Sequence, residues 1–197
     1  MAISSISYSN HGFSIALSWP AGVRGTVLYA LPRGAARPDD DVILAARDEQ
    51  ALLERYNGFC YRAGTASKIQ FSAAGPDLAA KWIDVCYCDF DKDGFAVAHE
   101  CAGSFFNGDC RVGFAIRYTP VSAGYRAVRI EVKNLSRFEI EPGGVGYAVG
   151  RRVFAIPVAL RPGRQLELPQ FEIPADAVVM MHRFEEKYPA RFVPLEA

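Results

Sequence analysis

Apolar and polar residues alternate along most of this chain, and this period-two pattern constrains the fold more than any other feature. It runs through residues 13–19, 112–118 and 128–132, where each apolar side chain is followed by a polar or small one. Successive side chains of a strand point to opposite faces, so these segments predict strands with one buried and one solvated face. Short strands separated by Gly, Pro, Asn and Asp clusters are typical of antiparallel β-sandwiches, which predicts a mainly all-β protein. Further strands are expected at Gly25–Leu31, Lys68–Ser72, Trp82–Phe90, Phe95–Glu100, Val145–Val149, Val153–Leu160, Gln165–Leu168 and Val178–Met181.

One segment departs from this period. Residues 42–58, VILAARDEQALLERYNG, are rich in strong helix formers. Asp39–Asp41 are capping candidates before the segment, and Asn57–Gly58 is a stop signal at its end. The pattern predicts one short helix that covers an open edge or end of the first sheet, with Leu44, Ala51 and Leu52 on its buried side.

The best domain boundary is the stretch GSFFNGDC, Gly103–Cys110, where Gly, Ser, Asn and Asp interrupt the strands. A chain of 197 residues is long enough for two modules of about 100 residues each. We therefore predict a first module at 1–102, which contains the helix, and a second at 103–197. Phe105 and Phe106 are unlike the residues of a flexible linker, so we expect them to be buried between the modules.

Three segments carry a resemblance to known modules. GFSIALSWPAGVRGTVLYALP, Gly12–Pro32, resembles a fibronectin type III-like domain, with an alternating strand that ends in Trp and a following strand that carries Tyr29. VRIEVKNLS, Val128–Ser136, and VALRPGRQLEL, Val158–Leu168, are similar to bacterial immunoglobulin-like modules. The resemblance implies two β-sandwiches of the immunoglobulin and fibronectin III type. It implies no site residue, because neither family has a fixed active site.

Charge and hydropathy exclude several classes of partner. The 22 basic residues balance the 22 acidic ones without a long run of either, which argues against a nucleic-acid or anionic-membrane surface. No apolar run approaches the roughly 20 residues of a membrane helix, so membrane insertion is not expected. The first 19 residues alternate and have no basic start, which predicts no secretory signal and a cytoplasmic location. The sequence gives no indication of the oligomeric state.

The five cysteines are expected to be reduced thiols. Their number is odd, and only Cys86 and Cys88 are close in sequence. On a strand, the side chains of a C-x-C pair share one face, and the spacing to Cys101 and Cys110 is not that of a paired zinc motif. Buried structural thiols are therefore the preferred interpretation, with a metal or redox site as the alternative. The fifth cysteine is Cys60, which is distant in sequence from the other four.

The stretch CDFDKDGFAVAHE, Cys88–Glu100, matches the pattern of a calcium loop. Asp89, Asp91, Asp93 and Glu100 are then the candidate metal ligands. Both flanks alternate and are rich in β-branched and aromatic residues, which instead predicts two strands joined by a turn, with Gly94 at positive φ. Glu100 then lies on the second strand, about 20 Å from the turn at the rise per residue of a strand, and does not complete the site. We prefer the hairpin, with a calcium-binding β protein as the alternative and no other cofactor expected.

No catalytic motif is visible. His11, His99 and His182 are far apart and lie outside known metal or nucleophile motifs. Gly146 and Gly150 lack the Lys-Ser/Thr ending of a phosphate loop, and Pro142 with the paired Gly143 and Gly144 is interpreted as a turn between strands. The basic Arg151, Arg152, Arg161 and Arg164 are interpreted as a solvated face.

We therefore predict a non-catalytic protein of two β-sandwich modules that binds a protein or a carbohydrate through loops or a sheet edge. The alternative is a hydrolase-type enzyme whose site assembles only in three dimensions, with His99 and His182 as the residues to test. A deep pocket with convergent polar groups would favour the enzyme.

Overall fold

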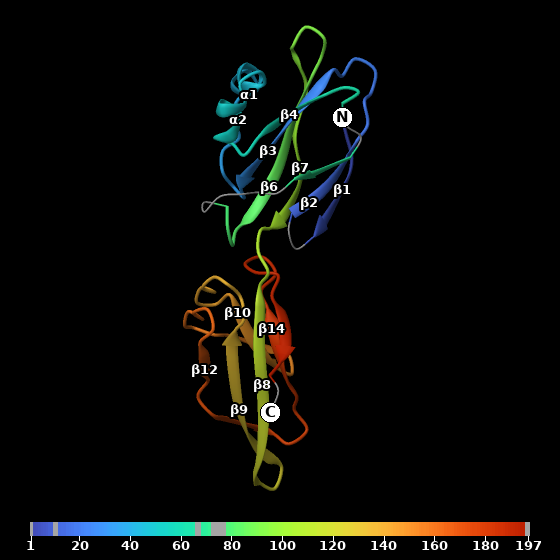
Figure 1. Ribbon diagram of the computed structural model, residues 1–197. Coiled ribbons are helices and arrows are strands. Elements are labelled where there is room, and N and C mark those ends of the chain that lie inside the picture. Colours follow the sequence, from blue (N-terminus) through green and yellow to red (C-terminus); the bar gives the residue numbers. More distant parts are fainter. Residues whose placement is uncertain (1, 10–11, 66–67, 72–77, 196–197) are drawn as a thin grey trace. The chain divides into compact units, whose positions relative to one another are not determined.

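The computed structural model confirms the all-β prediction. It describes residues 2–9, 12–65, 68–71 and 78–195, which form mainly strands with two short helices. His11 lies outside the described residues. The chain divides into two compact units, Met1–Gly108 and Asp109–Ala197 (Figure 1). Among the described residues no helix is long and apolar enough to cross a membrane.

The first unit packs two antiparallel sheets face to face. One sheet has the strand order β1-β2-β5 and the other the order β4-β3-β6-β7. The core between them contains the buried side chains of Ile15, Leu28, Ile83, Val85 and Tyr87. Burial of such apolar surface is the main stabilising contribution to a sandwich of this kind. The strands are β1 (Ile3–Ser9), β2 (Gly12–Leu17), β3 (Gly25–Pro32), β4 (Phe59–Arg62), β5 (Lys68–Phe71), β6 (Trp82–Phe90) and β7 (Ala96–Phe106).

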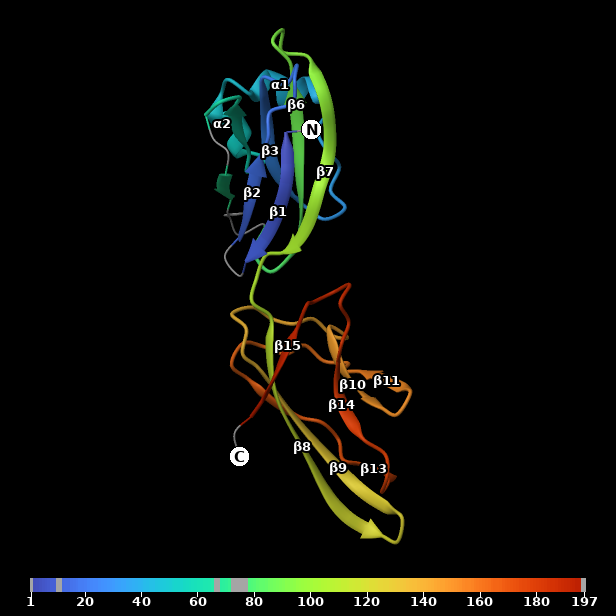
Figure 2. The same cartoon turned by 90° about the vertical axis from the view of Figure 1, so that its right-hand side faces the viewer.

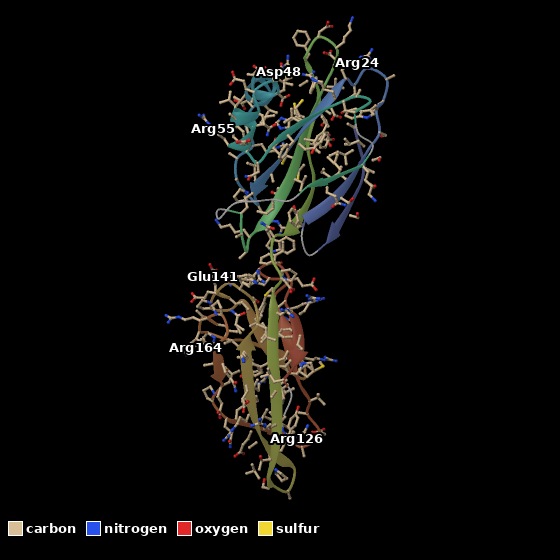
Figure 3. The ribbon with its side chains drawn as sticks, in the orientation of Figure 1. Arg24, Asp48, Arg55, Arg126, Glu141 and Arg164 are labelled. Atoms are coloured by element: carbon tan, nitrogen blue, oxygen red, sulfur yellow. The ribbon has the colours of Figure 1, made fainter. Side chains whose placement is uncertain are left out.

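The helical segment forms two helices instead of the one predicted. They are α1 (Asp40–Ala46) and α2 (Gln50–Glu54), and they cover the outer face of the four-stranded sheet (Figure 1). The interruption at 47–49 contains Asp48, which is labelled in Figure 3. Its carboxylate pairs with Arg62 of β4 at 2.5 Å. Leu44 is buried as predicted, but Ile43 and Leu53 are the most deeply buried residues of the two helices, and Ala51 is exposed.

The first unit extends beyond the predicted boundary at residue 102. β7 continues to Phe106, because Phe105 pairs with Ile83 and is buried in the core of the first unit. Phe106 makes an edge-to-face contact with Trp82, with ring centroids 5.8 Å apart. The two aromatic residues assigned to a connector between modules therefore belong to β7 and make these contacts within the first unit.

The second unit also contains two sheets. One has the order β12-β9-β8-β15, with β13 pairing to β9, and the other has the order β11-β10-β14. One pairing is not antiparallel, because β15 runs parallel to β8. The strands are β8 (Arg111–Ser122), β9 (Tyr125–Asn134), β10 (Val145–Val149), β11 (Arg152–Ala155), β12 (Gln165–Glu167), β13 (Phe171–Pro174), β14 (Val179–Arg183) and β15 (Arg191–Pro194).

Two predictions for the second unit need correction. The strand expected at 153–160 ends at Ala155, and beyond it only Leu160 pairs, in an isolated bridge with Ile140. The strands β13 and β15 were not predicted, because each has only four residues and too short an alternation to detect. The Asn turn after β9 is present: the buried Asn134 amide donates to the carbonyl of Leu160 at 2.6 Å.

Candidate functional site: a buried polar cluster beneath the helices

Strand alternation gathers five polar side chains on the helix-covered face of the four-stranded sheet. Tyr29 lies on β3, Cys86 and Cys88 on β6, and His99 and Cys101 on β7. The register places Cys88 opposite His99 and Cys86 opposite both Tyr29 and Cys101. Residues that are paired directly across strands share one face, so these five side chains lie together although no sequence motif connects them.

The sixth polar group comes from helix α1. Asp40 occupies the first turn of α1, and its Oδ1 contacts Nδ1 of His99. The other ring nitrogen of His99, Nε2, contacts the hydroxyl of Tyr29. The side chain of His99 is 8% exposed and that of Asp40 is 47% exposed, whereas Tyr29 is fully buried. Asp40, His99 and Tyr29 thus form a chain of hydrogen bonds from the surface into the interior.

Burial determines the protonation of the groups inside the cluster. Desolvation by burial, together with the neighbouring Cys86, raises the pKa of Tyr29, so its hydroxyl stays protonated. The same cause raises the pKa of the Cys88 thiol to about 12, with Asp40 adding to the effect. A protonated Tyr29 donates to Nε2, and Nδ1 of the ring then donates to the Asp40 carboxylate.

The hydrogen-bond chain continues toward the edge of the sheet. Tyr29 also lies within hydrogen-bond reach of the Cys86 thiol, and Cys86 lies within reach of the Cys101 thiol. Burial raises the pKa of Cys86 to about 12. Cys101 is exposed, and its thiol also contacts the carbonyl of Gly103 at 3.5 Å.

An open cavity of about 690 Å³ lies over the exposed end of this cluster. Residues 37–40 form one wall and residues 96–99 of β7 form the other. Arg37 donates from its guanidinium to the carbonyl oxygen of His99 at 3.4 Å, across this cavity. Asp40 and His99 therefore belong to both the cavity wall and the buried cluster.

The chemistry of the cluster does not favour nucleophilic catalysis. Tyr29 and Cys88 are fully buried and keep their protons, whereas a nucleophile needs access to substrate and a lowered pKa. Both ring nitrogens of His99 already have partners. Asp40, Cys88 and His99 do offer three potential metal-binding atoms within 4.8 Å of one another, which no sequence spacing indicates.

The residues of the calcium-like motif are separated in the structure. Asp89 is buried, and its Oδ2 accepts a hydrogen bond from the backbone N–H of Ala2 at 2.7 Å. Asp91 lies in the turn, where its Oδ1 accepts from the N–H groups of Asp93 and Phe95. Glu100 accepts from the Tyr87 hydroxyl at 3.2 Å, on the β1-side face of the sheet. The turn has Gly94 at φ 84°, so the strand–turn–strand interpretation of these flanks is confirmed.

The remaining candidates of the sequence lie apart from the cluster. His182 is on β14 of the second unit, where its ring packs edge-to-face on Phe184 at 4.9 Å. Arg161 pairs with Glu139 at 3.5 Å, and Arg152 is exposed on β11. Arg164, which is labelled in Figure 3, is also exposed. All five cysteines are free, as expected, and Cys86, Cys88 and Cys110 are buried; Cys60 is half-buried.

Sequence reasoning identified His99 but not its partners. Asp40 and Tyr29 are 59 and 70 residues away from it in the chain. Counting outward from the hairpin turn does not give these pairs, because the register shifts between Asp89 and Phe90. With Phe90 opposite Ala96, an unshifted ladder would place Ala98, and not His99, opposite Cys88.

Comparisons with known proteins give structural similarity alone. No family model matches the chain, and no curated protein sequence matches it. A crystal structure of the exo-chitosanase CsxA from Amycolatopsis orientalis is 12% identical with a TM-score of 0.31, and a complex of a variant with PNP-β-D-glucosamine is 13% identical with the same score. In both cases the match covers 91% of this chain and 25% of the other, so this chain spans about a quarter of that enzyme. At this similarity the match supports no statement about chemistry.

Proposed function

We propose that this protein is a non-catalytic binding protein whose first unit holds an extended segment of a protein partner along strand β7. The observation that carries the proposal is the open edge of β7 beside a cavity. β7 is eleven residues long and ends the sheet order β4-β3-β6-β7, and Figure 2 shows it at the margin of the first unit. An edge strand presents main-chain groups that a further strand can pair with.

The side chains along this edge suit an extended polypeptide. Phe95 immediately precedes β7 and Val97 is the second residue of β7, and their side chains are 70% and 53% exposed. Natural edge strands are usually protected by charges, and large apolar residues at such a position favour an interaction surface. Arg37, Asp39 and Asp40 line the opposite wall and supply polar groups that select for register and orientation.

A carbohydrate partner is less well supported. Stacking on a sugar requires a free aromatic face. In the second unit, the rings of Tyr147, Phe154 and Phe171 stack on one another and so cover part of their faces. Phe154 and Phe171 both stack on Tyr147, with ring centroids 5.2 and 5.4 Å away and near-parallel planes. Among the described residues the cavity beside β7 is lined by no Phe, Tyr or Trp, and the ring of its one histidine, His99, already has partners at both nitrogens.

The architecture supports the resemblance noted in the sequence. A three-stranded sheet facing a four-stranded one is compatible with a fibronectin III-like module in the first unit, with α1 and α2 added after β3. The two sheets of the second unit, with β15 parallel to β8, are compatible with a second sandwich-like module. Modules of these kinds commonly bind through loops and sheet edges, which supports a binding function over catalysis.

The test is selection of linear peptides from a displayed random library against the untagged protein. Peptides that bind wild type should lose at least about tenfold in affinity for Val97→Lys, because a charge on the edge opposes strand addition. The matched control is Val153→Lys, which places the same charge on β11, an edge strand of the second unit, at a residue 46% exposed. Amide NMR shifts on binding should concentrate in β7.

Three results would count against the proposal. The first is peptide binding that Val97→Lys leaves unchanged. The second is binding of glycans, but not of peptides, by the same preparation. The third is enzymatic turnover in a broad hydrolase screen that His99→Ala abolishes, which would support the alternative of an enzyme.

A further inference from the structure

We propose that Asp40, Cys88 and His99 bind a transition-metal ion of the zinc class. The carboxylate, thiol and ring-nitrogen atoms of these residues lie within 4.8 Å of one another. Ligand atoms around a tetrahedral zinc ion lie about 3.3 to 3.8 Å apart at the usual bond lengths. Oδ1 of Asp40 contacts Nδ1 of His99 more closely than two ligands of one ion lie, so the Asp40 carboxylate has to turn away from the ring as the ion enters. Asp40 is half-exposed at the start of α1, outside the packed core.

The donor set decides the class of metal. Thiolate sulfur and imidazole nitrogen are ligands of zinc and similar ions, whereas calcium and magnesium take oxygen ligands. The three residues come from α1, β6 and β7, which are held together by the register of β6 with β7 and by packing of the helices on the sheet. The positions of two of the three ligands are therefore fixed by the sheet itself.

The proton balance is simple. The ion replaces the proton that Nδ1 of His99 directs at Asp40, and that proton is carried on Nε2 in the metal-bound tautomer. Nε2–H then donates to the Tyr29 oxygen, and the Tyr29 hydroxyl turns toward the Cys86 sulfur within its reach. The Cys88 thiol releases its proton to water as the sulfur–metal bond forms. Tyr29 thus provides the orienting hydrogen bond that metal-bound histidines usually have.

The cavity provides both an entry path and a further coordination position. Asp40 and His99 line it directly, so an ion reaches these two ligands from solvent, and the third ligand, Cys88, is buried behind them on β6. Three protein ligands leave a fourth position of a tetrahedral ion directed toward this space, where water or a donor group from outside completes the sphere. The inference does not depend on the proposed peptide partner.

Cobalt(II) titration of the untagged, chelator-treated and reduced protein tests the inference. Cobalt in a site with one thiolate gives tetrahedral d–d bands and a sulfur-to-cobalt charge-transfer band, which free cobalt lacks. One equivalent is expected to bind, and zinc is expected to displace it, as zinc binds more tightly than cobalt. Cys88→Ser should remove the charge-transfer band, and Asp40→Asn should weaken binding about tenfold or more while leaving the fold intact, because Asp40 is half-exposed.

The controls separate this site from adventitious thiol binding. Cys101→Ser removes the exposed thiol next to the cluster, and Cys110→Ser removes a buried thiol of the second unit. Both variants should keep the wild-type spectrum. If Cys88→Ser fails to fold, the Asp40→Asn and Cys101→Ser pair decides the question. A wild-type spectrum equal to that of free cobalt would overturn the inference, as would a thiolate band that survives in Asp40→Asn at full affinity or disappears in Cys101→Ser.

Discussion

The hairpin of β6 and β7 contains two regions that contrast sharply: the Asp-rich turn matches a binding motif, and the buried cluster matches none. In the turn, Oδ1 of Asp91 accepts from the backbone N–H groups of Asp93 and Phe95, while Asp89 and Glu100 have partners elsewhere. In the cluster, Asp40, Cys88 and His99 converge from three separate elements. The comparison teaches that convergence depends on strand register and faces, and that short spacing in the sequence does not ensure it.

Removing His99 should have the largest effect on the stability of the first unit. His99→Ala leaves the fully buried Tyr29 hydroxyl with only the weak sulfur acceptor of Cys86 and creates a void, which costs about 2 to 4 kcal/mol in the free energy of unfolding. Both tryptophans, Trp19 and Trp82, lie in the first unit, so urea unfolding followed by tryptophan fluorescence reports this unit alone. His182→Ala in the second unit is the control and should leave the fluorescence transition in place. A His99→Ala midpoint equal to wild type would show that the cluster contributes little.

A smaller effect is expected for the two tyrosines on opposite faces of the sheet. Tyr29→Phe removes the donor to Nε2 of His99 and should cost about 1 to 2 kcal/mol. Tyr87→Phe removes a hydroxyl that bonds the exposed Glu100, which water can solvate instead, so it should cost less than about 1 kcal/mol. The same unfolding measurement compares the two. Equal costs would mean that the polar network on the helix side is no more important than one bond at the surface.

The smallest effect is expected in the turn. The double variant Asp91→Asn and Asp93→Asn keeps an oxygen at position 91 that accepts from the N–H groups of residues 93 and 95. The unfolding free energy should therefore change by less than about 0.5 kcal/mol. A loss as large as that of His99→Ala would show that the carboxylate charges of the turn have a structural role that its hydrogen bonds do not account for.

Periodicity predicted much of the fold. The alternation at 82–90 and 95–100 predicted both strands of the hairpin, and Gly94 predicted its turn. The division of the helical segment into α1 and α2 was not predictable, because residues 47–49 contain no Gly or Pro that would mark a stop. Short strands such as β15 were missed because a four-residue alternation carries little signal.

The candidate site was only partly accessible from the sequence. His99 was named as a residue to test, and the C-x-C pair was correctly assigned to one face of a strand. Asp40 was considered only as a helix cap, yet Asp39 occupies the cap position and Asp40 turns its side chain to His99. That choice depends on how α1 packs on the sheet, which is tertiary information that local patterns do not contain.

The most direct test of the account is a thermal melt of the first unit in the untagged full-length protein, with zinc and with calcium, followed by tryptophan fluorescence. Zinc at a hundredfold excess over its Kd should stabilise the wild type by about 2.7 kcal/mol and raise its Tm by several degrees. The Asp91→Asn, Asp93→Asn variant should respond to zinc in the same way, Asp40→Asn should not, and millimolar calcium should change the Tm of wild type little. A rise of many degrees with calcium, lost in the turn variant, together with no response to zinc, would contradict the account and place the metal chemistry in the Asp-rich turn.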